Sequence, residues 1–110
     1  MIEILYCFDE NYNIQGFSSI YSLLNKSSRK LNINLIHKTI SDVNLIPKRI
    51  LNHKNLNKIK VYKFKNNGYK FPNINGSHVS EATYYRLFID DYLPKSIEQI
   101  VYMDADIICV

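Results

Sequence analysis

The sequence predicts an α/β fold with a Rossmann-like, mostly parallel sheet. Short apolar segments of strand length alternate along the chain with segments whose apolar residues recur at helical spacing. Polar residues directly follow the first apolar segment, and two aspartates follow the last. In an open parallel sheet the carboxyl ends of the strands meet at one edge, and ligands bind there. We therefore expect one site built from residues at both ends of the chain.

The first strand is predicted over residues 2–8, an apolar run that only Glu3 interrupts. From Tyr12 the spacing of the apolar residues changes to that of a helix. Asn11 or Asn13 can cap this helix, and the polar residues 25–28 end it. The apolar residues at helical spacing are Ile14, Phe17, Ile20, Tyr21 and Leu24.

A second strand is predicted over residues 33–40 and a third over residues 58–64, with a helix between them. Ser41 or Asp42 can cap that helix, and Pro47 suits its first turn, where no N–H is needed. The apolar face of this helix would consist of Leu45, Ile46, Ile50 and Leu51.

The second half of the chain begins with a polar loop over residues 66–77, whose length and glycine and proline content indicate an exposed functional loop. A helix is expected to start at Ser80 and to end before Pro94. The last predicted strand covers residues 100–102. Strand–helix alternation of this kind favours parallel strands joined by helical crossovers.

Composition and charge narrow the function classes. The 110 residues are 46% hydrophobic and carry a formal net charge of +4, which suits an anionic ligand or an acidic surface. The lysines of residues 54–65 fit either a solvated strand or a nucleic-acid patch, but no RNA-binding signature accompanies them, and we expect no nucleic-acid partner. The chain has no glycine-rich phosphate loop, which argues against dinucleotide-binding and P-loop proteins.

The two cysteines, Cys7 and Cys109, lie in apolar runs and lack the spacing of a zinc pair. We interpret them as buried, reduced thiols. No signal peptide opens the chain, and no apolar stretch approaches the length of a membrane span. The expected location is therefore cytoplasmic, with peripheral association to the inner membrane left open.

Asp104 and Asp106 are the most informative residues for chemistry. They close an apolar run that looks like a buried strand, where two like charges need a compensating group. Residues i and i+2 of a strand share a face, so both carboxylates can approach one cation. Hard oxygen ligands suit Mn²⁺ or Mg²⁺, which would bridge the aspartates to a diphosphate. The sequence therefore predicts a metal–phosphate site.

Other polar residues each allow two interpretations. Asp9 and Asn11 could hydrogen-bond a base or ribose, or could serve only in a turn. Arg86 could extend to solvent from its helix, or could reach a phosphate or an aspartate at the sheet edge. His78, at the end of the polar loop, could be structural or could contact a ligand.

Three segments together resemble glycosyltransferase family 8, a retaining family that includes bacterial lipopolysaccharide galactosyl- and glucosyltransferases and glycogenin. Residues 4–12 resemble the family's opening strand and nucleotide loop. Residues 80–87 resemble its central helix, which carries an arginine, and residues 101–106 resemble its metal motif. The resemblance covers nearly the whole chain and implies a nucleotide-diphospho-sugar transferase (GT-A) fold.

The resemblance also implies roles for individual residues. A UDP-sugar would be the donor and Mn²⁺ the usual metal, with Asp104 and Asp106 as ligands. Asp9 and Asn11, with the backbone near Cys7 and Phe8, would hold the uridine, and Ala105 would lie against the ribose. Arg86 would contact the sugar-phosphate region and help to place the aspartates, and His78 would lie on the acceptor side. No residue is assigned as a nucleophile.

The family pattern continues beyond residue 110. In the family, the later part supplies a histidine as a third metal ligand, a lysine near the phosphates, and much of the acceptor site. Residues 1–110 are therefore expected to be the N-terminal, nucleotide-sugar-binding part of one glycosyltransferase domain, and to be inactive alone. The expected reaction is metal-dependent hexosyl transfer to a glycan or lipid-linked saccharide. The alternatives are a truncated, non-catalytic UDP-binding remnant and an α/β interaction module.

Overall fold

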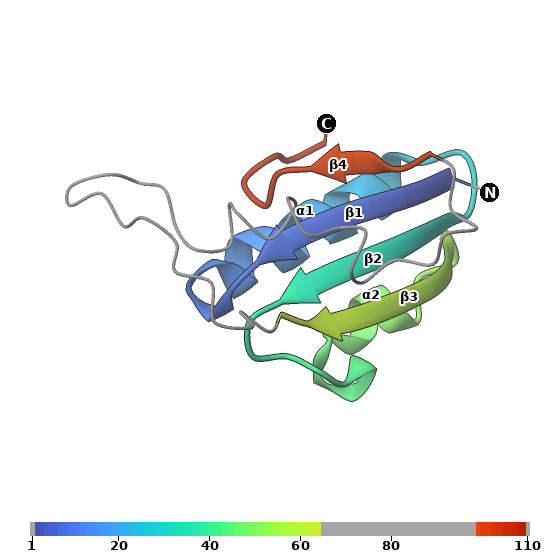
Figure 1. The fold of residues 1–110 in the computed structure, drawn as a ribbon. Helices are drawn as coiled ribbons and strands as arrows, with labels where there is room; N and C mark the ends of the chain where they lie inside the picture. The colour runs from blue at the N-terminus through green and yellow to red at the C-terminus, as the bar shows by residue number, and fades with distance from the viewer. Residues whose placement is uncertain (1, 65–98, 110) are drawn as a thin grey trace.

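The computed structural model describes residues 2–64 and 99–109, in which four parallel strands form one sheet (Figure 1). The order of the strands is β3-β2-β1-β4. The strands are β1 (Ile2–Phe8), β2 (Leu31–His37), β3 (Leu56–Lys63) and β4 (Val101–Met103). The predicted parallel α/β architecture is confirmed, and each predicted strand matches an observed strand to within three residues at either end.

The strand order places β1 between β2 and β4. From β1 the chain adds β2 and then β3 on one side, whereas β4 pairs with the other side of β1. The direction in which strands are added therefore reverses at β1. A reversal of this kind opens a crevice beyond the carboxyl ends of the two strands concerned, where ligands of open α/β sheets bind. This point lies between β1 and β4.

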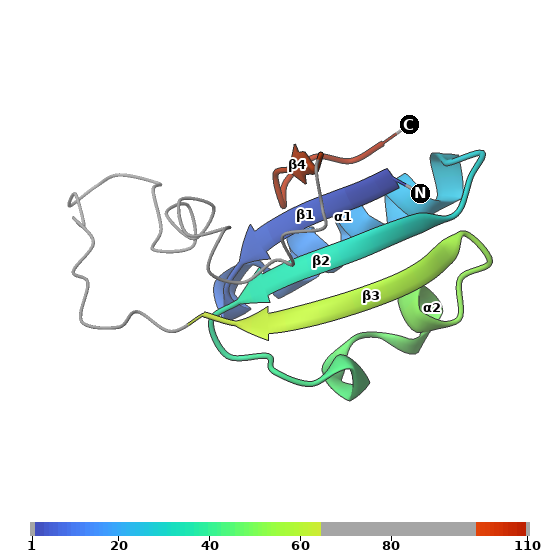
Figure 2. The same cartoon turned by 45° about the vertical axis from the view of Figure 1, so that its right-hand side comes forward.

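Two α-helices, α1 (Asn13–Lys26) and α2 (Lys48–Leu51), lie on one face of the sheet (Figures 1 and 2). Two 3₁₀ helices, η1 (Glu10–Tyr12) and η2 (Val43–Leu45), precede them. Alternate residues of β1 and β2 face these helices, as strand geometry requires. The core between sheet and helices includes Ile4, Tyr6, Phe8, Ile33 and Leu35 from the strands and Phe17, Ile20, Leu24 and Ile50 from the helices.

Gly16 brings α1 into very close contact with β1. A Cβ atom at this position would overlap the ring of Phe8, the last residue of β1. The Phe8 ring also packs edge-on against Phe17 and His37, at centroid distances of 5.4 and 5.3 Å. Glycine therefore sets how closely the helix approaches the carboxyl end of the central strand.

The second helical region differs from the single helix that the sequence predicted. Asp42 does act as a cap, but of η2, where its carboxylate accepts from the backbone N–H of Asn44 at 2.9 Å. Helical structure resumes only at α2, after Pro47. Ile46 is extended because the residue before a proline is sterically excluded from the helical region. Pro47 thus separates two short helices instead of entering the first turn of one.

The start of α1 also differs from the prediction. Asn11 and Asn13 were expected as caps, yet Tyr12 is the N-cap residue and makes no side-chain cap bond. The reason is that η1 runs directly into α1, so Asp9 caps the combined helical segment from its first turn. Ile14 is 82% exposed and does not join the core. The buried residues of α1 lie on a different side of the helix; they are Gly16, Phe17, Ser19, Ile20 and Leu24.

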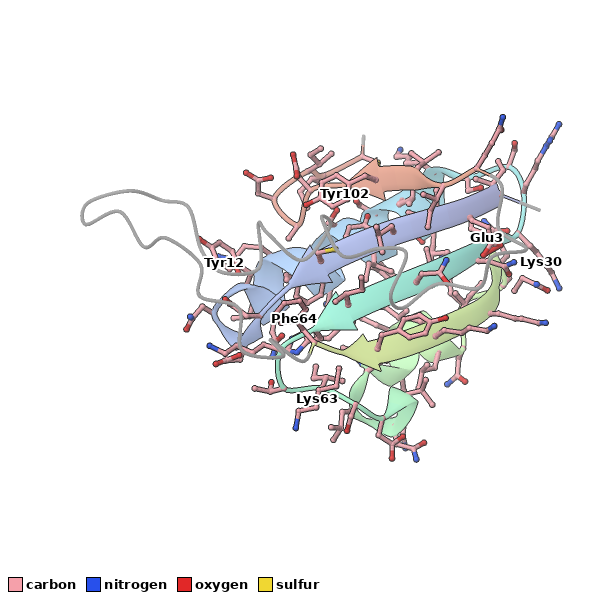
Figure 3. All side chains as sticks on the ribbon, in the orientation of Figure 1. Glu3, Tyr12, Lys30, Lys63, Phe64 and Tyr102 are labelled. Atoms are coloured by element: carbon pink, nitrogen blue, oxygen red, sulfur yellow. The ribbon has the colours of Figure 1, made fainter. Side chains whose placement is uncertain are left out.

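The two edges of the sheet differ in their surroundings. Figure 3 shows Glu3 and Lys30 at the amino edge and Tyr12 at the carboxyl edge. On β3, Lys58 and Lys60 are exposed while Ile59 and Val61 are half-buried, which confirms the alternation expected of a strand with one solvated face.

In the described part of the chain, no helix is long and apolar enough to cross a membrane.

Candidate functional site at the β1–β4 edge

The carboxyl ends of β1 and β4 bring the two predicted polar clusters together. Asp9 directly follows β1 and Asp104 directly follows β4, and these strands are neighbours in the sheet. The register pairs Tyr6 with Met103, so Asp104 leaves the sheet level with Cys7. The expectation that both clusters share one edge is confirmed. The shared edge is also the point at which the strand order reverses.

Asp9 is buried and has one oxygen committed to local structure. The side chain is 5% exposed, and Oδ1 accepts from the backbone N–H of Asn11 at 2.9 Å. The turn interaction that the sequence allowed is therefore present. The second oxygen, Oδ2, has no hydrogen-bond donor among the described residues. A carboxylate oxygen that is buried without a donor is costly, so an N–H donor at Oδ2 would be favourable.

Asn11 and the two residues before Asp9 can contribute in different ways. The Asn11 side chain is exposed, next to the carboxylate that its backbone binds. The side chains of Cys7 and Phe8 are both buried, with Phe8 facing α1 and Cys7 facing the opposite side of the sheet. Only their backbone groups could face a ligand at this edge, and that is the role which the family resemblance implied for them.

Asp104 and Asp106 flank a residue that faces the core. Both aspartates are exposed, whereas Ala105 between them is half-buried and packs against the core cluster. The chain turns back after β4, with the Ile107 N–H donating to the Asp104 carbonyl at 3.2 Å (Figure 1). Within residues 2–64 and 99–109, neither carboxylate forms an ion pair with a lysine or arginine.

The acidic pair fits a hard divalent cation in donor type but supplies few ligands. Carboxylate oxygens are preferred by Mn²⁺ and Mg²⁺, and both side chains are exposed at the point where ligands collect. No group of three or more histidine, cysteine, aspartate or glutamate residues that could hold a metal occurs in the described part of the chain. A cation bound here would take its remaining ligands from elsewhere, such as a diphosphate or water.

A buried histidine lies at the carboxyl end of β2, the strand beside β1. His37, the last residue of β2, is fully buried, and its Nδ1 accepts from the backbone N–H groups of Thr39 and Ile40 at 3.0 and 2.9 Å. Its Nε2 therefore carries the proton and donates to Asn13 Oδ1 at 2.7 Å. Burial lowers the pKa of His37 below its usual 6.5, and the nearby Glu10 and Asp9 oppose this effect. His37 is thus neutral and structural.

The sequence analysis missed His37 and three hydroxyl groups at this site. Tyr6 and Ser19 are fully buried, and their hydroxyl oxygens lie 3.0 Å apart. Ser19 also contacts the Asp104 carbonyl, and Ser22 contacts the backbone of Cys109. The available signal was a pair of serines in α1 on or beside the apolar face. A serine on that face needs a polar partner, but the spacing of apolar residues does not reveal which residue that partner is.

Two predicted site residues, His78 and Arg86, lie outside the described residues, as does the helix expected from Ser80. Their roles stay predictions. The two cysteines form no disulfide in the described part of the chain, and Cys7 is buried while Cys109 is half-buried. Two apolar side chains after Asp106 are exposed, Ile107 by 42% and Ile108 by 52%.

Comparison with known proteins identifies the family and the fold class of this chain. A family model described as glycosyl transferase family 8 matches residues 3–110, and the chain belongs to that family. Among solved structures, the chain is similar to an active-site mutant of LgtC, with a TM-score of 0.75 and 21% sequence identity. The match covers 96% of this chain but only 38% of the LgtC chain. It shows an α/β fold of the GT-A type. No curated protein matches the sequence significantly.

Proposed function

We propose that this chain supplies the nucleotide-sugar-binding part of a metal-dependent glycosyltransferase. The reaction would move a hexose from a UDP-sugar to a glycan or lipid-linked saccharide, with retention at the anomeric carbon. The proposal rests on one observation: Asp9 follows β1, and Asp104 and Asp106 follow the adjacent strand β4, at the point where the strand order reverses. Membership of glycosyl transferase family 8 supports glycosyl transfer as the reaction class.

Asp9 is the residue we assign to the uracil base. Its buried Oδ2 lacks a donor among the described residues, and the imide N–H of uracil is a donor of the required kind. The Asn11 amide, exposed beside it, can bind a base carbonyl or a ribose hydroxyl. Backbone groups at Cys7 and Phe8 would complete this pocket. Because a buried acceptor is selective for ligands that supply its missing donor, Asp9 would favour uracil over bases that lack one there.

Asp104 and Asp106 are the residues we assign to Mn²⁺ or Mg²⁺. Such a cation would neutralise negative charge on the departing diphosphate. The two carboxylates would hold it together, and Ala105, which packs against the core, lies between them in the sequence. By family resemblance, Ala105 would lie against the ribose, Arg86 would contact the sugar-phosphate region, and His78 would lie on the acceptor side.

Retention would follow from attack on the same face from which UDP leaves. We assign no residue of this chain as a covalent nucleophile. The acceptor hydroxyl would then attack from the leaving-group side, held close to the departing diphosphate. We also propose that residues 1–110 are the N-terminal part of one transferase domain. We propose a cytoplasmic location, with peripheral contact to the inner membrane left open.

A second candidate function is UDP binding without sugar transfer. Two observations favour it for residues 1–110 taken alone: the chain spans 38% of the length of LgtC, and the described residues provide only two acidic metal ligands at this edge. The two candidates predict the same nucleotide contacts and differ in turnover. A transfer assay therefore separates them.

The test is turnover of UDP-glucose and UDP-galactose by the intact protein, with Mn²⁺, followed by proton NMR of the anomeric signals. We expect UDP release and a product with the α-configuration of the donor, and near-complete loss of turnover in Asp104→Asn and Asp106→Asn. Glu10→Gln, an exposed acid at the same edge, is the matched control and should keep activity. An inverted product, or full activity in both aspartate variants, would contradict the proposal.

A further inference from the structure

Two hydroxyl groups of α1 hold residues 104–109, which we call the aspartate loop. Ser19 Oγ donates to the Asp104 carbonyl at 3.5 Å, and the Cys109 N–H donates to Ser22 Oγ at 2.9 Å. The two contacts lie on either side of Asp106. One helix therefore binds the aspartate loop near both of its ends.

The direction of each hydrogen bond follows from the groups involved. The Asp104 carbonyl can only accept, so Ser19 must donate its single proton to it. Tyr6 must then donate to Ser19, at 3.0 Å. Burial raises the pKa of Tyr6 to about 12, so the phenol keeps that proton at neutral pH. In the same way Ser22 donates to the Ser19 carbonyl at 2.8 Å, which leaves its oxygen to accept from Cys109.

Ser19 and Ser22 are expected to stabilise α1 less than alanine would at the same positions. Serine is a poorer helix former than alanine, and a buried hydroxyl needs a partner. Ser19 is nevertheless fully buried, among Phe17, Ile20 and Leu24 of the same helix. Alanine would fill a helix–sheet contact at lower cost. What the Ser19 hydroxyl adds is a link between β1, α1 and the aspartate loop.

The aspartate loop has few apolar contacts of its own. Ile107 and Ile108 are exposed, and only Ala105 and Cys109 are half-buried. Hydrogen bonds to α1 therefore carry much of the order of this segment. Buried polar networks whose members are all satisfied favour one arrangement over its alternatives.

We infer that Ser19 and Ser22 are positioning residues, which hold the aspartate loop so that Asp104 and Asp106 face a metal together. The metal part of this inference rests on the proposed function, but the restraint on the loop does not. Neither serine needs to contact the metal or the nucleotide. Each acts through the backbone of the loop that carries the aspartates, and Tyr6 acts through Ser19.

The test compares Ser19→Ala and Ser22→Ala with Ser18→Ala in the intact protein. Ser18 is a half-buried serine of the same helix with no side-chain bond to the loop among the described residues, so it controls for the gain in helix propensity. Amide hydrogen exchange is followed by NMR at Ile107 and Cys109, with Leu24 reporting on the helix itself. Mn²⁺ affinity is measured in the presence of UDP by calorimetry, with Asp104→Asn as the reference variant.

Loss of either serine hydroxyl should speed exchange at Ile107 and Cys109 by roughly two- to tenfold, the range that one net hydrogen bond gives. Mn²⁺ affinity should fall by a similar factor of roughly two to ten. Exchange at Ile107 and Cys109 should rise more than exchange at Leu24, which reports any loss of global stability when Tyr6 loses its partner. Ser18→Ala should leave both readouts unaltered. Unchanged loop exchange in Ser19→Ala and Ser22→Ala would overturn the restraint itself.

Two further outcomes separate this inference from the proposed function. If the loop loosens but Mn²⁺ affinity stays normal, while Asp104→Asn abolishes binding, the serines do not position the metal ligands and the proposed metal site stands. If Asp104→Asn leaves Mn²⁺ affinity unchanged, the metal site is refuted and the positioning of metal ligands falls with it. In that case, amide hydrogen exchange at Ile107 and Cys109 still tests whether the two serines hold the aspartate loop.

Discussion

Gly16→Ala tests how α1 is held against the central strand, because two opposing effects act at this position. Alanine is a better helix former than glycine by about 1 kcal/mol, which favours the variant. However, the new Cβ would overlap the Phe8 ring, which is 1% exposed and enclosed by Phe17 and His37. Overpacking in a closed core costs about 1–3 kcal/mol. Because the overlap is severe and the ring is buried, we place the cost in the upper part of this range, at about 2–3 kcal/mol, and expect net destabilisation of about 1–2 kcal/mol.

The assay is urea and thermal unfolding followed by far-UV circular dichroism, with a double-mutant cycle through Phe8→Leu. Leucine lacks the ring atoms that the new Cβ would meet, so the double variant should recover at least about 1 kcal/mol of the Gly16→Ala loss. Ser18→Ala, in the same helix, should change stability by less than about 0.5 kcal/mol. A Gly16→Ala variant that is more stable than wild type by the full helix-propensity gain would refute the close contact between α1 and β1.

Two further predictions concern the polar groups at the same edge. His37 has a pKa lowered below 6.5 in the folded protein, so its stabilising effect is present above pH 6.5 and is lost as pH falls below that value. In denaturant titrations, the free energy of unfolding of wild type should therefore fall by up to about 1.4 kcal/mol per pH unit below pH 6.5, and that of His37→Asn should fall less. An equal dependence of the unfolding free energy on pH in the two proteins would contradict this. Asp9→Asn keeps an oxygen for the cap and should match wild type in stability, whereas Asp9→Ala should lose about 1 kcal/mol. Both Asp9 variants should bind UDP about tenfold more weakly. Normal UDP binding by Asp9→Asn would mean that Asp9 only stabilises its turn and does not bind the nucleotide.

Patterns of apolar spacing predicted the sheet well, because β1 is buried on both faces and reads as an apolar run, whereas β3 has one solvated face and reads as an alternation. The range of β1 was predicted without error, and Phe17, Ile20 and Leu24 were placed correctly in the core. The place of Asp9 and the acidic pair at one edge followed from their position after strands. The strand order did not follow from the sequence, although it is what places the reversal at the β1–β4 edge.

The errors arose where local sterics or tertiary contacts override spacing. Pro47 forces its preceding residue into an extended conformation, and one predicted helix becomes two. Ile14 has helical spacing but lies off the buried face of α1. Asn13, expected as a cap, instead accepts from His37, a residue 24 positions away. Contacts over such a separation cannot be inferred from one sequence, and the same holds for Ser19 and Asp104, which are 85 positions apart.

The central claim is that one metal-assisted nucleotide site lies at the β1–β4 edge. Calorimetric titration of UDP into the intact protein, with and without Mn²⁺, tests it most directly. We predict that Mn²⁺ strengthens UDP binding by at least about tenfold in wild type and in Glu10→Gln, and that this gain disappears in Asp104→Asn and Asp106→Asn. The same Mn²⁺-dependent gain in both aspartate variants as in wild type, or UDP binding that does not respond to Mn²⁺ at all, would contradict the account.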